Sequence, residues 1–201
     1  MKKINLDLGW EFYHGEISVF ASPNSLGWQR VNLPHDWSIQ LPMRPEGPSD
    51  AQGAYLDGGI GNYRKTLAAP ADWAGKRVVL QIGAAYQDAE IRLNGDLVCQ
   101  HGYGYTTFLV DLTGKLRCGK DNALAIRVNN GAQPNARWYS GSGLYRHVDL
   151  LVGEAAHIAP RGVYVTTPKA AAEGSEVLVE TTLGNLGAAT GVTLEQRVLD
   201  E

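Results

Sequence analysis

Apolar and polar side chains alternate along much of this chain, which is the period-two pattern of β-strands. In the run RVVLQIG, Val78, Leu80 and Ile82 occupy one face. The same alternation returns in residues 122–130 and 146–153. Segments rich in glycine, proline and asparagine separate these runs and are typical of turns. The pattern therefore predicts many short strands joined by loops.

The run EIRLNGDLV at residues 90–98 predicts a β-hairpin. Its central pair, Asn94-Gly95, readily adopts the positive φ angles of a tight turn. No segment shows an amphipathic helical pattern, and residues 70–76 form at most one helical turn. Short strands without crossover helices predict an all-β antiparallel sandwich or jelly roll that closes near Gly153.

A second set of strand-like runs follows a small apolar linker at residues 154–160. Three alternating pairs mark it: Val163 and Val165, Val177 and Val179, and Val192 and Leu194. An immunoglobulin-like sandwich needs roughly 100 residues, so we interpret residues 156–201 as the first strands of a second domain that is cut partway. Its apolar face needs a cover. We expect this segment to pack on the first domain or to pair with a second copy, giving a homo-oligomer.

The composition argues against several classes of partner. Of the 201 residues, 44% are apolar and the formal net charge is -3, so the chain can form a core but lacks the basic surface of a nucleic-acid-binding protein. No run approaches the roughly 20 apolar residues of a membrane helix. The two N-terminal lysines precede no apolar run of the kind a signal peptide needs. We expect a cytoplasmic protein that binds neither nucleic acid nor a membrane.

Neither a metal ion nor a cofactor is expected. Cys99 and Cys118 lie far apart in the sequence, and the five histidines lack the spacing of metal ligands. The sequence favours two reduced thiols, as is usual in the cytosol, and leaves a disulfide between them open.

Several segments together resemble one family. The segments are LPHDWSI at 33–39, DGGIGNYRKTL at 57–67, GAAYQDAEIRLNGDLV at 83–98, FLVDLTGKL at 108–116 and RWYSGSGLYRHVDL at 137–150. In order and spacing they resemble the N-terminal sugar-binding domain of glycoside hydrolase family 2, and most of all its β-galactosidase members. The resemblance is strong over residues 1–155.

The resemblance implies a jelly-roll (galactose-binding-like) β-sandwich at residues 1–155, the start of an immunoglobulin-like sandwich at 156–201, and a catalytic (β/α)8 barrel further on. In the family, two glutamates of that barrel hydrolyse the glycoside with retention, so no catalytic residue is expected in this chain and the chain alone should be inactive. Its implied task is to complete the pocket for a β-galactoside and to brace the barrel. Left open are a β-glucuronide or β-mannoside substrate, a free-standing carbohydrate-binding module and a purely structural interaction domain.

Three residues are candidate contacts to sugar. Asp57 lies on a glycine-rich loop that in the family borders the sugar subsite, and a role in the turn is equally open. Arg137 stands where several family members have a sugar-binding Asp. A guanidinium donates but cannot accept hydrogen bonds, so Arg137 either contacts sugar oxygens or anchors the barrel. Trp138 is the one tryptophan in a polar, glycine-hinged loop, and it offers a ring platform or a buried seam contact.

The neighbouring motif LPHDWSI is interpreted as structural. Trp37 is expected to fill the sandwich core, and Asp36 to accept backbone N–H groups in its turn. His35 is a lone histidine for which neither a sugar nor a metal role is favoured. Asn62 departs from the family pattern, where an aromatic residue is common.

Overall fold

The computed structural model describes residues 1–18, 22, 25–135 and 138–199. Its strands are β1 (Lys2–Asn5), β2 (Trp10–His14), β3 (Gln29–Val31), β4 (Gly59–Ala69), β5 (Arg77–Ile82), β6 (Ala89–Leu93), β7 (Asp96–His101), β8 (Phe108–Asp111), β9 (Lys120–Asn130), β10 (Val148–Gly153), β11 (Ala156–Lys169) and β12 (Glu176–Asn185). Two short 3₁₀ turns, η2 (Ser38–Gln40) and η3 (Ala71–Trp73), interrupt the loops. The prediction of an all-β chain is confirmed. In the part described, no helix is long and apolar enough to cross a membrane.

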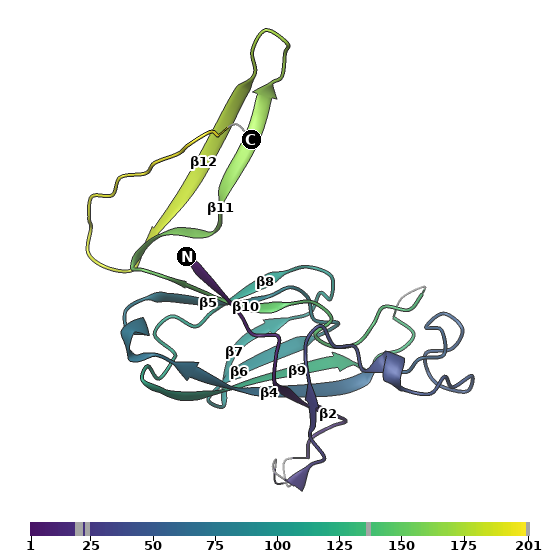
Figure 1. Ribbon diagram of the computed structural model, residues 1–201. Helices are drawn as coiled ribbons and strands as arrows, with labels where there is room; N and C mark the ends of the chain where they lie inside the picture. Colours follow the sequence, from purple (N-terminus) through teal and green to yellow (C-terminus); the bar gives the residue numbers. More distant parts are fainter. Residues whose placement is uncertain (19–21, 23–24, 136–137, 200–201) are drawn as a thin grey trace.

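Two antiparallel sheets form a sandwich (Figure 1). A four-stranded sheet has the order β1-β10-β5-β8, and a six-stranded sheet has the order β3-β2-β4-β9-β6-β7. Alternate residues of each strand point between the sheets, where Leu80, Ile91, Ile126 and Leu150 are fully or almost fully buried. This is the packing that alternating apolar positions predict, because side chains of successive strand residues point to opposite faces.

The expected hairpin turn is present. β6 pairs antiparallel with β7, and Asn94 and Gly95 both adopt positive φ, at 54° and 96°. Asn94 also donates from its side-chain amide to Asn122 Oδ1 at 2.9 Å, which ties the turn to the start of β9. The local sequence thus fixes both the turn and the pairing of its strands.

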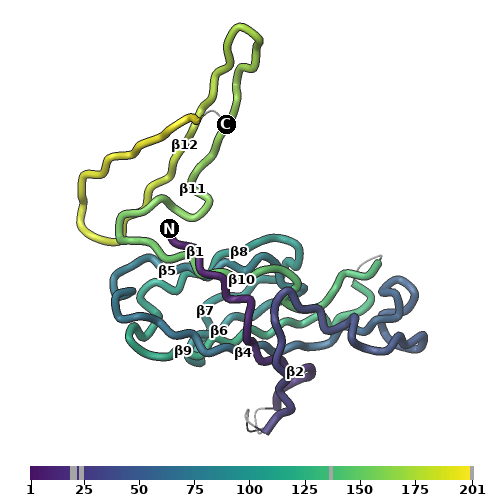
Figure 2. The backbone as a smooth tube through the Cα atoms, in the orientation of Figure 1, coloured from purple at the N-terminus to yellow at the C-terminus, as the bar shows by residue number. Residues whose placement is uncertain are grey.

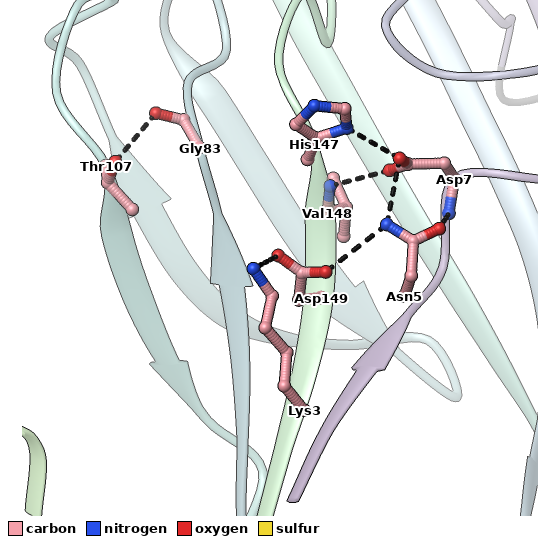
Figure 3. Close-up of polar contacts among 8 residues, drawn as sticks. All are labelled: Lys3, Asn5, Asp7, Gly83, Thr107, His147, Val148 and Asp149. Atoms are coloured by element: carbon pink, nitrogen blue, oxygen red, sulfur yellow. Dashed lines mark hydrogen bonds and ion pairs between the residues drawn. The ribbon is translucent and has the colours of Figure 1, made fainter. Parts of the chain in front are cut away.

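The N-terminal strand is fixed to the sandwich by a polar network (Figure 3). β1 pairs with β10, and Asp7 then accepts hydrogen bonds from the backbone N–H of Val148 at 3.0 Å and from Asn5 Nδ2 at 2.8 Å. His147 Nδ1 lies 2.6 Å from the same carboxylate. Burial raises the pKa of Asp7, but these hydrogen bonds outweigh burial, so its pKa lies below the usual value.

Residues 156–185 form a separate hairpin of β11 and β12 that projects away from the sandwich (Figure 2). Its apolar side chains are largely in solvent: Val163 is 52%, Val165 57% and Val177 51% exposed. The expectation that this segment packs on the first domain is wrong. Pairing with a second copy stays a prediction, as do the division at residue 155 and the immunoglobulin-like nature of the tail.

The third strand expected around Val192 and Leu194 is also absent from the described residues, because residues 188–199 form no strand. This segment runs back along the hairpin, where Gln196 Nε2 donates to Thr181 Oγ1 at 3.0 Å. Val192 and Leu194 stay 56% and 44% exposed. Alternation alone does not form a strand where no ladder of backbone hydrogen bonds forms.

Candidate functional site

The candidate site lies where two loops meet at one end of the sandwich. One loop runs from the end of β3 to the start of β4, and the other runs from the end of β9 to the start of β10. Both extend beyond the strands on the same side in Figure 1. They converge because β4 and β9 are antiparallel neighbours, with Gly59 opposite Asn130. Segments far apart in the sequence therefore share one surface.

Glycines at the start of β4 and in the loop after β9 allow the backbone to pack closely against core side chains. At Gly61 an added Cβ would lie 2.3 Å from the Trp37 ring, and at Gly143, where φ is +119°, it would lie 2.3 Å from the Tyr63 hydroxyl. Neither distance is possible for a real side chain, so only glycine fits. Trp37 itself is 2% exposed, and its indole N–H donates to the Gly58 carbonyl at 2.8 Å. The prediction that Trp37 fills the core is confirmed.

Asp36 organises the junction of the loops. Its Oδ1 accepts the backbone N–H groups of Ser38 and Ser142, both at 3.0 Å, and its Oδ2 accepts the Tyr139 hydroxyl. Burial and this hydrogen bond to Asp36 raise the pKa of Tyr139, so its hydroxyl stays protonated. Asp36 therefore acts as the structural acceptor that the sequence predicts, and it also joins two loops that are distant in sequence.

A buried network of neutral polar side chains continues the junction. Ser38 Oγ lies 2.6 Å from Ser142 Oγ and donates to the Asp57 carbonyl at 2.9 Å. Asn130 Nδ2 donates to Ser142 Oγ at 2.8 Å, and Asn135 Nδ2 donates to Asn130 Oδ1 at 2.5 Å. Satisfied networks of this kind hold a loop surface in one shape. Periodicity gave no indication of these residues, because each lies at a strand end or in a loop.

The side chain of Asp57 is turned partly inward. It is 20% exposed, and its Oδ2 lies 3.4 Å from Arg44 Nη1. Its Oδ1 is buried and has no hydrogen-bond partner among the described residues. A buried carboxylate oxygen without a partner is costly and therefore uncommon. Asp57 thus both braces its loop through Arg44 and keeps one unused acceptor, so its sugar contact stays a prediction.

Trp138 is the exposed feature of the site. It is 69% exposed and borders a small cavity of about 10 Å³, whose other walls include Leu56, Tyr139 and Ser142. A cavity of this size holds about one water molecule and no sugar ring. Any ligand here must therefore lie on the open surface beside Trp138. Arg137, the third predicted contact, lies outside the described residues.

A tyrosine cluster, which the sequence did not single out, lies at the same end. Tyr103 and Tyr105 are 61% and 45% exposed, and their rings meet edge-on at 5.6 Å. Tyr105 also packs on the buried Tyr86, whose hydroxyl reaches Asn135 Oδ1 at 3.3 Å. Burial and the hydrogen bond with Tyr86 raise the pKa of Tyr105 to about 12. Exposed rings beside a polar network suit contacts with sugars or with protein.

Two further expectations concern single residues. His35 is buried, and its Nδ1 lies 2.9 Å from the Tyr63 hydroxyl, so it belongs to the core; burial lowers its pKa. Asn62 is buried and donates to the Gly15 carbonyl at 2.8 Å, which fixes the loop after β2. Neither side chain is available to a ligand at the loop junction.

The carboxylates described at this end make structural contacts. The Asp36 carboxylate is occupied by three donors, and Asp57 faces Arg44. In the described part of the chain, no group of three or more His, Cys, Asp or Glu side chains could hold a metal ion. Cys99 and Cys118 are free thiols. The site is therefore a loop end of a jelly-roll-type β-sandwich, held by buried hydrogen bonds and bearing exposed aromatic rings.

Comparisons with known proteins agree with this class. The chain is 37% identical over 186 residues to the β-galactosidase BoGH2A of Bacteroides ovatus, covering 92% of this chain and 22% of that protein. It is 34% identical over 166 residues to a putative β-glucuronidase of Formosa agariphila, covering 82% and 16%. A crystal structure of a glycosyl hydrolase family 2 member from Bacteroides cellulosilyticus matches with a TM-score of 0.84 at 36% identity, over 91% of this chain and 24% of that one. No family model matches the chain.

The chain is thus a β-sandwich domain of glycoside hydrolase family 2, and the resemblance seen in the sequence is confirmed. It spans less than a quarter of the length of each of these three proteins. The two curated relatives are named β-galactosidase and putative β-glucuronidase. The comparisons therefore identify the family but not the sugar of the substrate.

Proposed function

We propose that this chain is the N-terminal part of a longer family 2 β-galactosidase. In that enzyme its loop end forms one wall of the pocket for the terminal galactose and packs against a catalytic (β/α)8 barrel. The observation that carries the proposal is the loop junction itself. A buried polar network holds Trp138 exposed beside the loop that bears Asp57. Such rigid, preorganised positioning is what a pocket wall requires.

The choice of galactoside rests on chemistry at Asp57 and on the likeness to BoGH2A. A neutral sugar brings no charge to the Asp57 carboxylate, whose side chain is 20% exposed beside Arg44. A glucuronide would bring a second carboxylate close to Asp57, and like charges repel unless a cation intervenes. Arg137 could supply that cation, so β-glucuronidase is the alternative that a substrate panel must decide.

The first test is to read the natural gene beyond the codon for residue 201. A barrel with Asn-Glu-Pro near a strand end is expected, whereas a stop codon supports a free-standing carbohydrate-binding module. A substrate panel then tests the choice of sugar. For the longer protein, kcat/KM should be at least about tenfold higher with p-nitrophenyl β-galactoside than with p-nitrophenyl β-glucuronide, a difference near 1.4 kcal/mol. A preference for the glucuronide would overturn the galactosidase proposal. The 201-residue chain alone should hydrolyse neither, because a retaining glycosidase needs two carboxyl groups about 5–5.5 Å apart.

The second test uses the loop residues in the longer protein. Arg137→Ala should lower kcat/KM by a factor equivalent to about 1–3 kcal/mol of transition-state stabilisation. This is the usual cost of losing a hydrogen bond that involves a charged group. Trp138→Ala should also lower kcat/KM while leaving Tm nearly unchanged, because the ring is 69% exposed. Tyr55→Ala, which removes another exposed ring of the same loop end, is the matched control. Unchanged kinetics with a large loss of Tm would favour the anchor role over sugar contact.

A further inference from the structure

A groove lies on the outer face of the six-stranded sheet, the face turned away from the four-stranded sheet. It encloses about 370 Å³ and is lined by side chains of β4, β6 and β9 together with Trp28. This volume falls within the range of small-ligand sites. None of the sequence motifs pointed to this face, because its residues occupy the polar positions of alternating strands.

The strand register explains why the face is hollow. Ala125 of β9 lies between Arg64 of β4 and Arg92 of β6 in one cross-strand row. In the next row, Arg127 of β9 lies between Asn62 and Glu90. One methyl group between long side chains leaves a depression with Ala125 as its floor. The depression is therefore a consequence of side-chain size at one position, on a regular sheet.

The rim combines an aromatic ring with paired charges. The Arg64 guanidinium lies 4.2 Å from the centre of the Trp28 ring. Each rim arginine also has a glutamate partner, and the pairs are Arg64 with Glu11 at 2.8 Å, Arg92 with Glu90 at 3.6 Å, and Arg127 with Glu16 at 3.0 Å. These pairs fix the guanidinium groups in place and leave the rim without a surplus of either charge.

We propose that this groove binds a short neutral oligosaccharide. Sugar hydroxyls both donate and accept hydrogen bonds, which matches a rim of alternating guanidinium donors and carboxylate acceptors. The apolar face of a pyranose ring can pack on the methyl group of Ala125 and against Ile17, which also lines the groove. An anionic glycan or nucleic acid would need unpaired cations, and each rim arginine is already neutralised. The proposal does not depend on the pocket-wall function proposed above.

Titration calorimetry on the 201-residue chain tests this site with short β-linked galacto-, gluco- and xylo-oligosaccharides and with an oligouronate. At least one neutral oligosaccharide should bind. Ala125→Leu should weaken that binding by about tenfold or more, equivalent to about 1.4 kcal/mol, because the larger side chain fills the floor. Ala123→Leu is the matched control, since Ala123 lies on the same face of β9 and does not line the groove. Both variants should keep the wild-type Tm, because both positions face outward.

Three outcomes would overturn the proposal. The first is that no neutral oligosaccharide binds the wild-type chain at millimolar concentration. The second is that binding is unchanged in Ala125→Leu, which would place the ligand elsewhere. The third is that only the oligouronate binds, which contradicts a charge-neutral rim. Hydrolysis by the longer protein and its response to Trp138→Ala are separate measurements, so failure of one proposal leaves the other standing.

Discussion

The sandwich and the hairpin of residues 156–185 have the same sequence pattern and opposite environments. In β5, alternate residues Val78, Leu80 and Ile82 are at most 2% exposed, because a second sheet covers them. In β11, Val163 and Val165 are more than half exposed. Alternation therefore specifies which side chains share a face, but not whether anything covers that face. A strand residue is therefore buried only where a second sheet packs on its face, and the two-stranded hairpin has no such opposing layer.

The largest expected difference is between two substitutions to alanine, one in the sandwich core and one in the hairpin. Leu80→Ala should lower the free energy of unfolding by about 2–5 kcal/mol, because it leaves a cavity in a closed core. Val165→Ala should change it by less than about 0.5 kcal/mol, because the side chain is 57% exposed. Urea denaturation measures both. Equal losses would show that the hairpin is buried in solution, most simply by a second copy.

The next largest effect concerns the loop junction. Asp36→Ala should cost about 1–3 kcal/mol, because two backbone N–H groups and the Tyr139 hydroxyl lose their acceptor. Tyr139→Phe removes only one of these hydrogen bonds and should cost less. Thermal unfolding of the two variants checks the order. If Tyr139→Phe were the more damaging change, Asp36 would not be the centre of the junction.

A pH-dependent effect is expected at the N-terminal strand. The pKa of Asp7 lies below its usual value of 3.8, so its contribution is complete above that value and is lost as the pH falls through the lowered pKa. At pH 7, Asp7→Asn should cost about 1–2 kcal/mol. As the pH falls through the lowered pKa of Asp7, the difference in stability between wild type and variant should close. Asp96→Asn removes an exposed carboxylate and is the matched control. A difference between wild type and Asp7→Asn that persisted at low pH would refute the explanation.

The smallest expected effect is that of removing the hairpin. A version ending at Glu154 should unfold with a free energy within about 0.5 kcal/mol of the full chain, because few contacts join β10 and β11. Its association state is the more informative measurement. Light scattering should show a larger mass for the full chain than for a monomeric short version, as pairing through the exposed hairpin predicts. Two monomers, with no binding of an apolar dye, would rule that pairing out.

Local chemistry made much of the fold predictable. The strands of the sandwich, the Asn94-Gly95 turn and the buried Trp37 all follow from side-chain period, positive φ at a turn and ring size. The candidate site was predictable only in part. Trp138 was identified because it stands in a polar loop, whereas the tyrosine cluster and the Ser38–Ser142 contact gave no signal along the chain.

The sequence by itself determined which residues share a face, where the chain turns and that strands rather than helices form. Only the tertiary structure decided what those faces meet. It placed Asp36 between two loops more than a hundred residues apart, hid one oxygen of Asp57 and set Ala125 between two arginines. It also left the hairpin uncovered. The physical reason is that period and turn propensity act between neighbours in the chain, whereas burial and hydrogen-bond satisfaction depend on segments that only folding brings together.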